Sequence, residues 1–470
     1  MTAAIYLAPV IAGAIALTAR HRTVRYGAAL VAAVAGFVLF AVSDSVGAWR
    51  TTGPGVAAGL AGAGIVLAFL VLLADPEARG ETAAQTGVAG SSLALFAAGM
   101  WLVPALLFWL TSSLALAAIV ASSKRRATTW LALALGDAAL VGVVVSAAIE
   151  AGSWTMPALG GWQIVVLFGA IVLRSGALPL SGQWPIERPS SAVAVPLLIA
   201  GSLVLAARFL RDPQPVLGAA LIVLGVLAGA TAAVWRFDMR ATGGFLVAVM
   251  LGISIAVPQV LPVAALAVLC AATTVALWPR ARGRARITRG FVLGSIPPMV
   301  AFGAISAAAT TSFERARAGE GIDGIAWAAI ASLLPLALAT GIALGAMAAR
   351  REPSDDFEPP AVIATWFVFA LSVVSGVWLG AFVPVGDAAI DGSTRALYLI
   401  ALIVGGIAAL RAPRATGPVA YGGIEVLQLA TERHRVLEGT AVALAAIAAV
   451  AAIAAAIYLT VLGLQQGFLA

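Results

Sequence analysis

Two ionisable residues stand inside long apolar stretches of this sequence. Asp137 lies in Leu-Gly-Asp-Ala-Ala-Leu-Val, and Arg174 lies in Val-Leu-Arg-Ser-Gly-Ala-Leu-Pro-Leu. A charge within a membrane helix is costly, and it usually marks an ion or proton route. The alternative is a charge that pairs with a neighbouring helix and only fixes the packing. The residues alone leave both interpretations open.

Motifs of soluble enzymes are absent from the sequence. It has no Gly-rich phosphate loop, no cysteine cluster and no histidine pair at metal-ligand spacing. The single cysteine, Cys270, lies in an apolar run, where an inert buried thiol is the expected state. His21 and His434 lie in basic segments, and we expect both to be solvated. We therefore expect no catalytic residue, no metal and no cofactor.

The composition indicates a protein whose surface faces lipid. Of the 470 residues, 62% are hydrophobic and 10% are charged, and the mean hydropathy is +1.03. A soluble domain carries about a quarter of charged residues. The net charge of +7 comes from short basic segments between apolar runs, which favours membrane topology over nucleic-acid binding. We expect an all-α polytopic membrane protein in the cell membrane (a bacterial inner membrane).

Apolar runs long enough for a membrane helix, roughly 20 residues each, predict 14–16 transmembrane helices. The number of spans between residues 85 and 123 is left open. The predicted spans begin near Ala3, Tyr26, Gly55, Gln85, Pro104, Thr129, Trp162, Ala192, Val216, Ala241, Leu261, Gly290, Ile325, Pro360, Arg395 and Gly439.

Basic residues recur in alternate loops, as expected on the inner side of a membrane. These loops contain Arg20–Arg25, Glu77–Arg79, Lys124–Arg126, Glu187–Arg188, Arg236–Arg240, Arg280–Arg289, Arg350–Arg351 and Arg411–Arg414. Glu150 lies in one of the intervening loops, which are poorer in Arg apart from the segment of Glu314, Arg315 and Arg317. With sixteen spans, both termini lie outside. Residues 417–437 fit either an interfacial helix or a solvated loop.

The segment from residue 167 to 193 resembles the broken seventh helix of the antiporter-like subunits of respiratory complex I. Related subunits occur in Mrp-type antiporters, membrane-bound hydrogenases and inorganic-carbon uptake complexes. In that family a Lys precedes a Ser-x-x-x-Pro bend, which Trp-Leu-Pro follows. Here Arg174 stands at the Lys position, while Pro179, Trp184, Pro185 and Pro189 keep the spacing.

Other motifs agree in order, and the resemblance covers roughly residues 90 to 310. Leu135-Gly136-Asp137 is similar to the family's Val-Gly-Asp. Arg236-Phe-Asp238-Met-Arg240 is similar to its Asp-x-Lys loop. Pro297 and Pro298 stand where the family has Pro-Pro-x-x-x-Phe in a second broken helix. The resemblance implies a proton path or intramembrane charges at Asp137, Arg174, Asp238, Arg240 and Glu187.

The sequence departs from the family at three relay positions. Leu110 follows Trp109 where the family has Glu, Pro196 or Leu197 falls where it has His, and Ile305 falls where it has a second Lys. Arg174 keeps its proton under any protein condition, so it supplies a fixed charge and not a proton carrier. Asp137 is then the best candidate to neutralise it.

The expected organisation has three regions. Residues 1–80 form N-terminal helices, 81–310 an antiporter-like core, and 311–470 the C-terminal helices. The broken helices at Pro179 and at Pro297–Pro298 suggest an inverted repeat.

Three functions are compatible with these observations. The first is a non-catalytic subunit of a complex I-related assembly with a degenerate proton route. The second is a working proton- or cation-coupled module that uses Asp137, and both would have other membrane subunits as partners. The third is a stand-alone secondary transporter of a small solute. A subunit of an inorganic-carbon uptake complex is a variant of the first.

Overall fold

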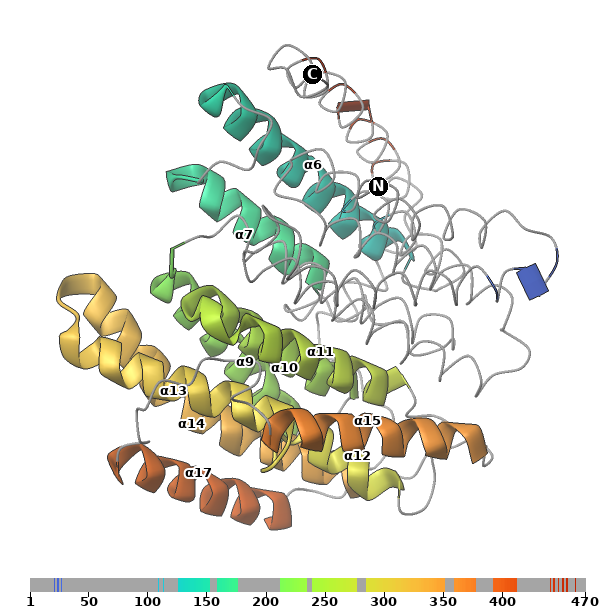
Figure 1. The fold of residues 1–470 in the computed structure, drawn as a ribbon, viewed down its shortest axis with the longest axis vertical. Coiled ribbons are helices and arrows are strands. Elements are labelled where there is room, and N and C mark those ends of the chain that lie inside the picture. Colours follow the sequence, from blue (N-terminus) through green and yellow to red (C-terminus); the bar gives the residue numbers. More distant parts are fainter. Residues whose placement is uncertain are drawn as a thin grey trace, which may run out of the picture. The chain divides into compact units, whose positions relative to one another are not determined.

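The computed structural model describes residues 126–152, 159–175, 212–234, 239–276, 285–350, 359–377 and 392–411. It also describes single residues, among them His21, Trp109 and Ser113. All regular structure in these ranges is helical (Figure 1). The predicted all-α class is confirmed.

The chain divides into two compact units that do not follow the sequence in simple blocks. Unit 1 comprises Met1–Ser175, Glu187–Arg211 and Gly422–Ala470, and unit 2 comprises Gly176–Ile186 and Asp212–Tyr421. The division of the chain into regions 1–80, 81–310 and 311–470 therefore differs from the compact units. As a division by function it stays a prediction, as does the inverted repeat.

In unit 1 the described helices are α6 (Arg126–Ala151) and α7 (Gly161–Ser175). The two run in opposite directions, because Gly136 lies against Ala170 while Ser146 lies against Gln163. Small residues at the contact let the two backbones approach closely, as in many membrane helix pairs.

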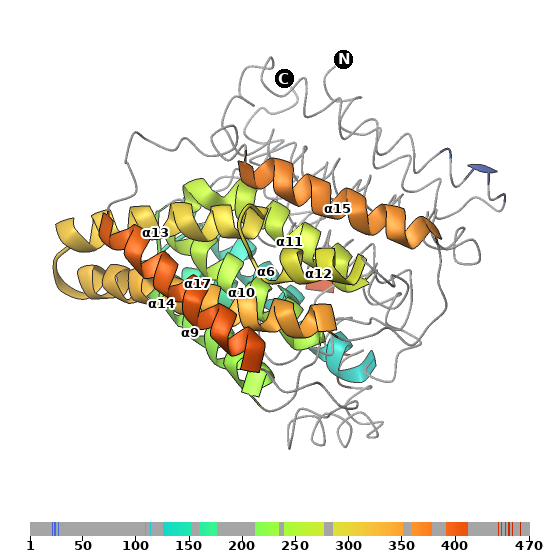
Figure 2. The ribbon, with the colours of Figure 1, turned by 90° about the horizontal axis from the view of Figure 1, so that it is seen from below.

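Unit 2 contains nine described elements, of which α14 is the longest (Figure 2). They are α9 (Pro215–Val234), α10 (Met239–Ala256), η3 (Pro258–Val260), α11 (Leu261–Ala276), α12 (Ala285–Leu293), α13 (Val300–Ala318), α14 (Gly321–Arg350), α15 (Pro359–Val377) and α17 (Gly392–Arg411). Helix α14 contacts α9, α12, α13 and α17, and α15 contacts α11, α12 and α13.

Glycines hold the helices of unit 2 at close range. A Cβ added at Gly218 of α9 would lie 2.7 Å from the carbonyl oxygen of Gly252 of α10, and the reverse distance is also 2.7 Å. Gly345 of α14 meets the backbone of Gly290 and Gly294 in the same way. Any larger side chain at these positions would force the helices apart.

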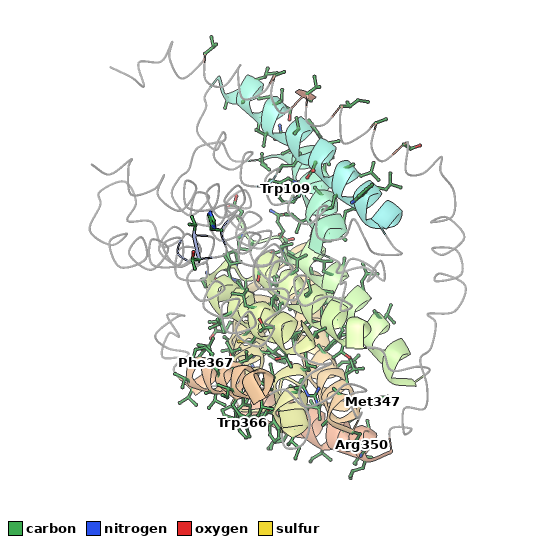
Figure 3. The ribbon with its side chains drawn as sticks, turned by 90° about the vertical axis from the view of Figure 1, so that its right-hand side faces the viewer. Trp109, Met347, Arg350, Trp366 and Phe367 are labelled. Atoms are coloured by element: carbon green, nitrogen blue, oxygen red, sulfur yellow. The ribbon has the colours of Figure 1, made fainter. Side chains whose placement is uncertain are left out.

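Long apolar faces cover the outside of the described helices. Two helices, Trp130–Ala151 and Gly321–Arg350, are long and apolar enough to cross a membrane. Helix α17 exposes Leu399, Ile403 and Leu410 by 59%, 61% and 79%. On α15 the aromatic side chains of Trp366 and Phe367 are exposed, as is common on helices that face lipid (Figure 3).

The apolar runs located most described helices correctly. The predicted starts at Thr129, Trp162, Val216, Ala241, Leu261, Ile325, Pro360 and Arg395 lie within about four residues of the observed starts. The predicted break at Pro297–Pro298 is also observed, because α12 ends at Leu293 and α13 begins at Val300. Predicted spans that begin before residue 105, at Ala192 or at Gly439 fall largely outside the described residues.

Several predicted loops overlap helix ends, since Arg126, Glu150, Arg240, Arg350 and Arg411 all lie in helices. The largest difference concerns α12. The loop predicted for Arg280–Arg289 ends earlier, since α12 begins at Ala285 and includes Arg289. The charge of Arg289 suggested a solvated loop, but the side chain is fully buried. Helical position decides its burial, because the exposed residues Ile287 and Phe291 occupy the opposite face of α12.

Candidate functional site: a buried aspartate in unit 1

Asp137 lies in the middle of α6, on a buried part of the helix. Its exposed fraction is 9%, and the neighbouring Leu133, Leu140 and Val141 are each exposed by 4% or less. A carboxylate in such surroundings needs hydrogen-bond donors, because an isolated buried charge is strongly destabilising.

Two side chains from a separate segment donate to this carboxylate. Trp109 Nε1 and Ser113 Oγ each donate to Asp137 Oδ1, both at 2.6 Å. The donors are themselves buried, with exposed fractions of 0% for Trp109 and 4% for Ser113. Figure 3 labels Trp109 beside the ribbon of unit 1. Such short distances are typical of hydrogen bonds to a charged oxygen.

The register of α6 and α7 brings the backbone of Arg174 near this site. A Cβ added at Gly136 would lie 3.3 Å from the carbonyl oxygen of Ala170 and 4.0 Å from the ring of Trp109. Arg174 follows Ala170 by one helical turn on α7, so it belongs to the same helix face. The Arg174 side chain is outside the described atoms, so its pairing with Asp137 stays a prediction.

A second polar cluster joins the C-terminal end of α6 to the N-terminal end of α7. Gln163 Nε2 donates to Ser146 Oγ at 3.2 Å and to Glu150 Oε2 at 3.1 Å. The backbone N–H of Gly160 donates to Gln163 Oε1 at 3.3 Å. Because Gln163 is 3% exposed, these bonds satisfy a buried amide and fix the turn between the helices.

The remaining predicted site residues are only partly described. Pro297 and Pro298 lie in the break between α12 and α13, joined by a cis peptide bond. Arg240 belongs to the first turn of α10, but its side chain is not described. Asp238, Glu187, Pro179 and Pro185 lie outside the described residues. Within the described ranges, no three His, Cys, Asp or Glu side chains gather where a metal ion would bind.

The sequence interpretation missed Ser113 as a partner of Asp137. Its spacing contained a usable signal, since Ser113 follows Trp109 by one helical turn and shares its face. Cys270, predicted to be an inert buried thiol, is indeed buried.

The fold has counterparts among solved membrane complexes. A chain of respiratory complex I from Thermus thermophilus, solved with bound aureothin, superimposes with a TM-score of 0.60 at 18% identity, over 82% of this chain and 99% of that chain. A chain of the membrane-bound sulfane sulfur reductase, an archaeal respiratory membrane complex, gives a TM-score of 0.56 at 16% identity, over 89% of this chain and 86% of that chain.

No protein-family sequence model and no curated protein sequence matches this chain. The likeness to the two complexes therefore lies in the fold. It extends over most of the chain, and it agrees with the predicted resemblance to antiporter-like subunits. At such low identity the chain is a divergent example of this membrane fold.

Proposed function

We propose that this chain is an antiporter-like membrane subunit of a complex I-related assembly, and that Asp137 is its proton-binding residue. The fold carries the first part, because the likeness covers 99% of the complex I chain. The buried Asp137 with its two donors carries the second part.

The two side chains that hydrogen-bond to Asp137 suit a carboxyl group that gains and loses a proton. When Asp137 is ionised, both Trp109 Nε1 and Ser113 Oγ donate to it. When it is protonated, its O–H needs an acceptor. Trp109 is a donor only, whereas a serine hydroxyl both donates and accepts. Ser113 can therefore reverse its hydrogen bond and stabilise either state of Asp137.

Arg174 has a different role in this proposal. Its guanidinium holds its proton permanently, so it sets the electrostatic potential at Asp137 and carries no proton itself. In this proposal the guanidinium attracts the Asp137 carboxylate as an opposite charge. A proton that binds Asp137 removes the negative charge that Arg174 attracts. Protonation of Asp137 is thereby coupled to the arrangement of α6 and α7.

The redox or uptake chemistry belongs to partner subunits. We propose no catalytic residue, metal or cofactor in this chain. The partners are other membrane subunits of a quinone-reducing, hydrogenase-like or carbon-uptake assembly in the cell membrane, and protons are the transported species.

Copurification tests the assembly directly. A tagged chain, extracted in mild detergent from its native membrane, should elute with other membrane subunits in constant proportion. The control is an unrelated polytopic protein carrying the same tag, which should not bring those subunits. A monodisperse chain that elutes alone and transports a solute after reconstitution would contradict the proposal and favour a stand-alone transporter.

A further inference from the structure

The break between α12 and α13 contains a backbone conformation that serine seldom adopts. After α12 ends, Gly294 N donates to Gly290 O at 2.9 Å, and Ile296 N donates to Phe291 O at 3.5 Å. Ser295, between them, has a φ of 52°. Helix ends of this kind usually place glycine at the left-handed position. Ser295 therefore stands where glycine would be less strained.

The hydroxyl of Ser295 is the second unusual feature. The residue is 1% exposed, and Oγ makes no hydrogen bond within the structure. An unsatisfied buried hydroxyl is costly, and few occur in a native protein. A strained backbone and an unsatisfied hydroxyl at one residue together indicate that something other than folding stability favours this serine.

Polar and small residues of α15 enclose the break. Val300 N, the first amide of α13, donates to Ser372 Oγ at 3.3 Å, and Ser372 is fully buried. Gly376 lies so close to the carbonyl oxygen of Pro298 that no Cβ would fit there. The α13 N-cap residue, Met299, offers no side-chain hydrogen bond to the remaining first-turn amides.

The break lies beside a helix that is long and apolar enough to cross a membrane. Helix α12 runs against α14 with Gly290 beside Gly345, and Gly294 O lies 3.4 Å from a Cβ added at Gly341. After the break, α13 packs against α14, and Gly319 at the end of α13 meets Gly324 in the first turn of α14. Gly294, which directly precedes Ser295, therefore lies beside the C-terminal half of this 30-residue helix.

The surroundings of the break favour a neutral ligand over a metal cation. Arg289, on the buried face of α12, places a permanent positive charge in the same short helix. Ile305, at the position where the resemblance to antiporter-like subunits puts a second lysine, is a buried apolar residue of α13. No amine is available at that position to carry a proton.

We propose that the α12–α13 break binds ordered water through Ser295 Oγ. A buried water makes about three hydrogen bonds to polar groups that the protein leaves unsatisfied. The Ser295 hydroxyl is a group of that kind. Water binding is independent of the proposed function. A role for this water in proton movement rests on that function, with water replacing the ionisable side chain in unit 2.

A structure of the chain with its native partners, at a resolution that shows water, tests the site. We expect a density peak about 2.8 Å from Ser295 Oγ. The peak should vanish in Ser295→Ala while the path of the main chain is kept. A well-defined Ser295 side chain without any neighbouring peak would overturn the proposal.

The direction in which Ser295→Ala shifts the melting temperature gives an independent test. If Ser295 holds water, Ser295→Ala should lower the melting temperature by roughly 2–4 °C. Ser312→Ala is the matched control. Ser312 is also fully buried with an unsatisfied Oγ, but it lies within regular helix, where a serine can bond the carbonyl one turn back without water. A rise in melting temperature for Ser295→Ala, or equal losses at both positions, would overturn water binding.

Proton flux distinguishes a failure of the water's relay role from a failure of the proposed function. In reconstituted assemblies that translocate protons, Ser295→Ala should lower the flux severalfold, and Ser312→Ala should leave it unchanged. Unchanged flux in Ser295→Ala would overturn the relay role. Absence of flux in the wild-type assembly would overturn the proposed function and the relay role together, while the density peak would still establish the water site.

Discussion

The two compact units place polar groups in their interiors in different ways. In unit 1, Asp137 lies on an unbroken helix, and the side chains of Trp109 and Ser113 satisfy it. In unit 2, the α12–α13 break contains the buried hydroxyl of Ser295, on a residue with a left-handed backbone.

The packing differs as well. Glycines of α6 and α7, such as Gly142 and Gly169, have open space around them. In unit 2, Gly290 and Gly345 bring two backbones together.

Gly136 is the exception in unit 1, since a Cβ added there would lie 3.3 Å from the carbonyl oxygen of Ala170. The contacts of Gly290 in α12 and Gly345 in α14 are tighter than this one. Removing the Asp137 carboxylate in unit 1 should change stability through lost charge interactions. Adding a side chain at Gly345 in unit 2 should change stability by pushing two helices apart.

The largest effect is expected from separating Asp137 and Arg174. Asp137→Asn or Arg174→Gln alone should lower the free energy of unfolding by about 3–5 kcal/mol, because each leaves a buried charge without its partner. The double variant should recover much of that loss. Unfolding in detergent measures all three variants. Losses that simply add would show that the two side chains do not interact.

A smaller loss is expected from filling the α12–α14 contact. Gly345→Ala places a Cβ against the backbone of Gly290 and Gly294, so we expect a loss of about 1–3 kcal/mol, typical of an overpacked core. Gly142→Ala is the control in unit 1, where nothing lies within 4 Å of the added Cβ. The control should keep or raise stability, since alanine favours a helix over glycine. Equal losses would remove the packing difference between the units.

The two donors to Asp137 should each contribute less than the charge itself. Trp109→Phe and Ser113→Ala each remove one hydrogen bond to a carboxylate, which is typically a loss of about 1.5–3 kcal/mol. Ser332→Ala is the control, because its hydroxyl bonds only the Ala328 carbonyl within an exposed part of α14. If the donor variants unfold like the control, the hydrogen bonds to Asp137 add nothing to stability.

The order of elements could be predicted from the sequence, because apolar run length and proline position act locally. The starts of α7, α9, α11 and α15 and the break at Pro297–Pro298 follow from such local signals. The two-unit organisation could not be predicted, because unit 1 joins residues from both ends of the chain. Such pairing depends on long-range packing.

The candidate site shows the same division. Asp137 is evident as an acid in an apolar run, but its donors come from a segment that lies far from it in the sequence. The burial of Arg289 was missed, because an arginine beside a basic segment resembles a loop residue until the helix face is known. The left-handed Ser295 was missed for a related reason, since this conformation usually selects glycine.

The smallest stability change is expected from Arg174→Lys, which keeps the positive charge. We expect a change below about 1 kcal/mol, within the range of mild substitutions. The variant is informative for transport, because a buried lysine can release its proton whereas arginine cannot. Proton flux should be kept, because lysine supplies the same positive charge, or raised, if the lysine also releases its proton. Flux that falls to background while stability is unchanged would contradict the electrostatic role proposed for Arg174.

Proton flux through the reconstituted assembly, compared between Asp137→Asn and Asp137→Glu, tests the role of unit 1 most directly. Asparagine keeps the shape and a hydrogen-bond acceptor but cannot bind a proton, whereas glutamate keeps the titratable carboxyl group. With the assembly intact in each case, the account predicts flux near background for Asp137→Asn and substantial flux for Asp137→Glu. Wild-type flux in Asp137→Asn would contradict it and would leave Asp137 as a structural partner of Trp109 and Ser113.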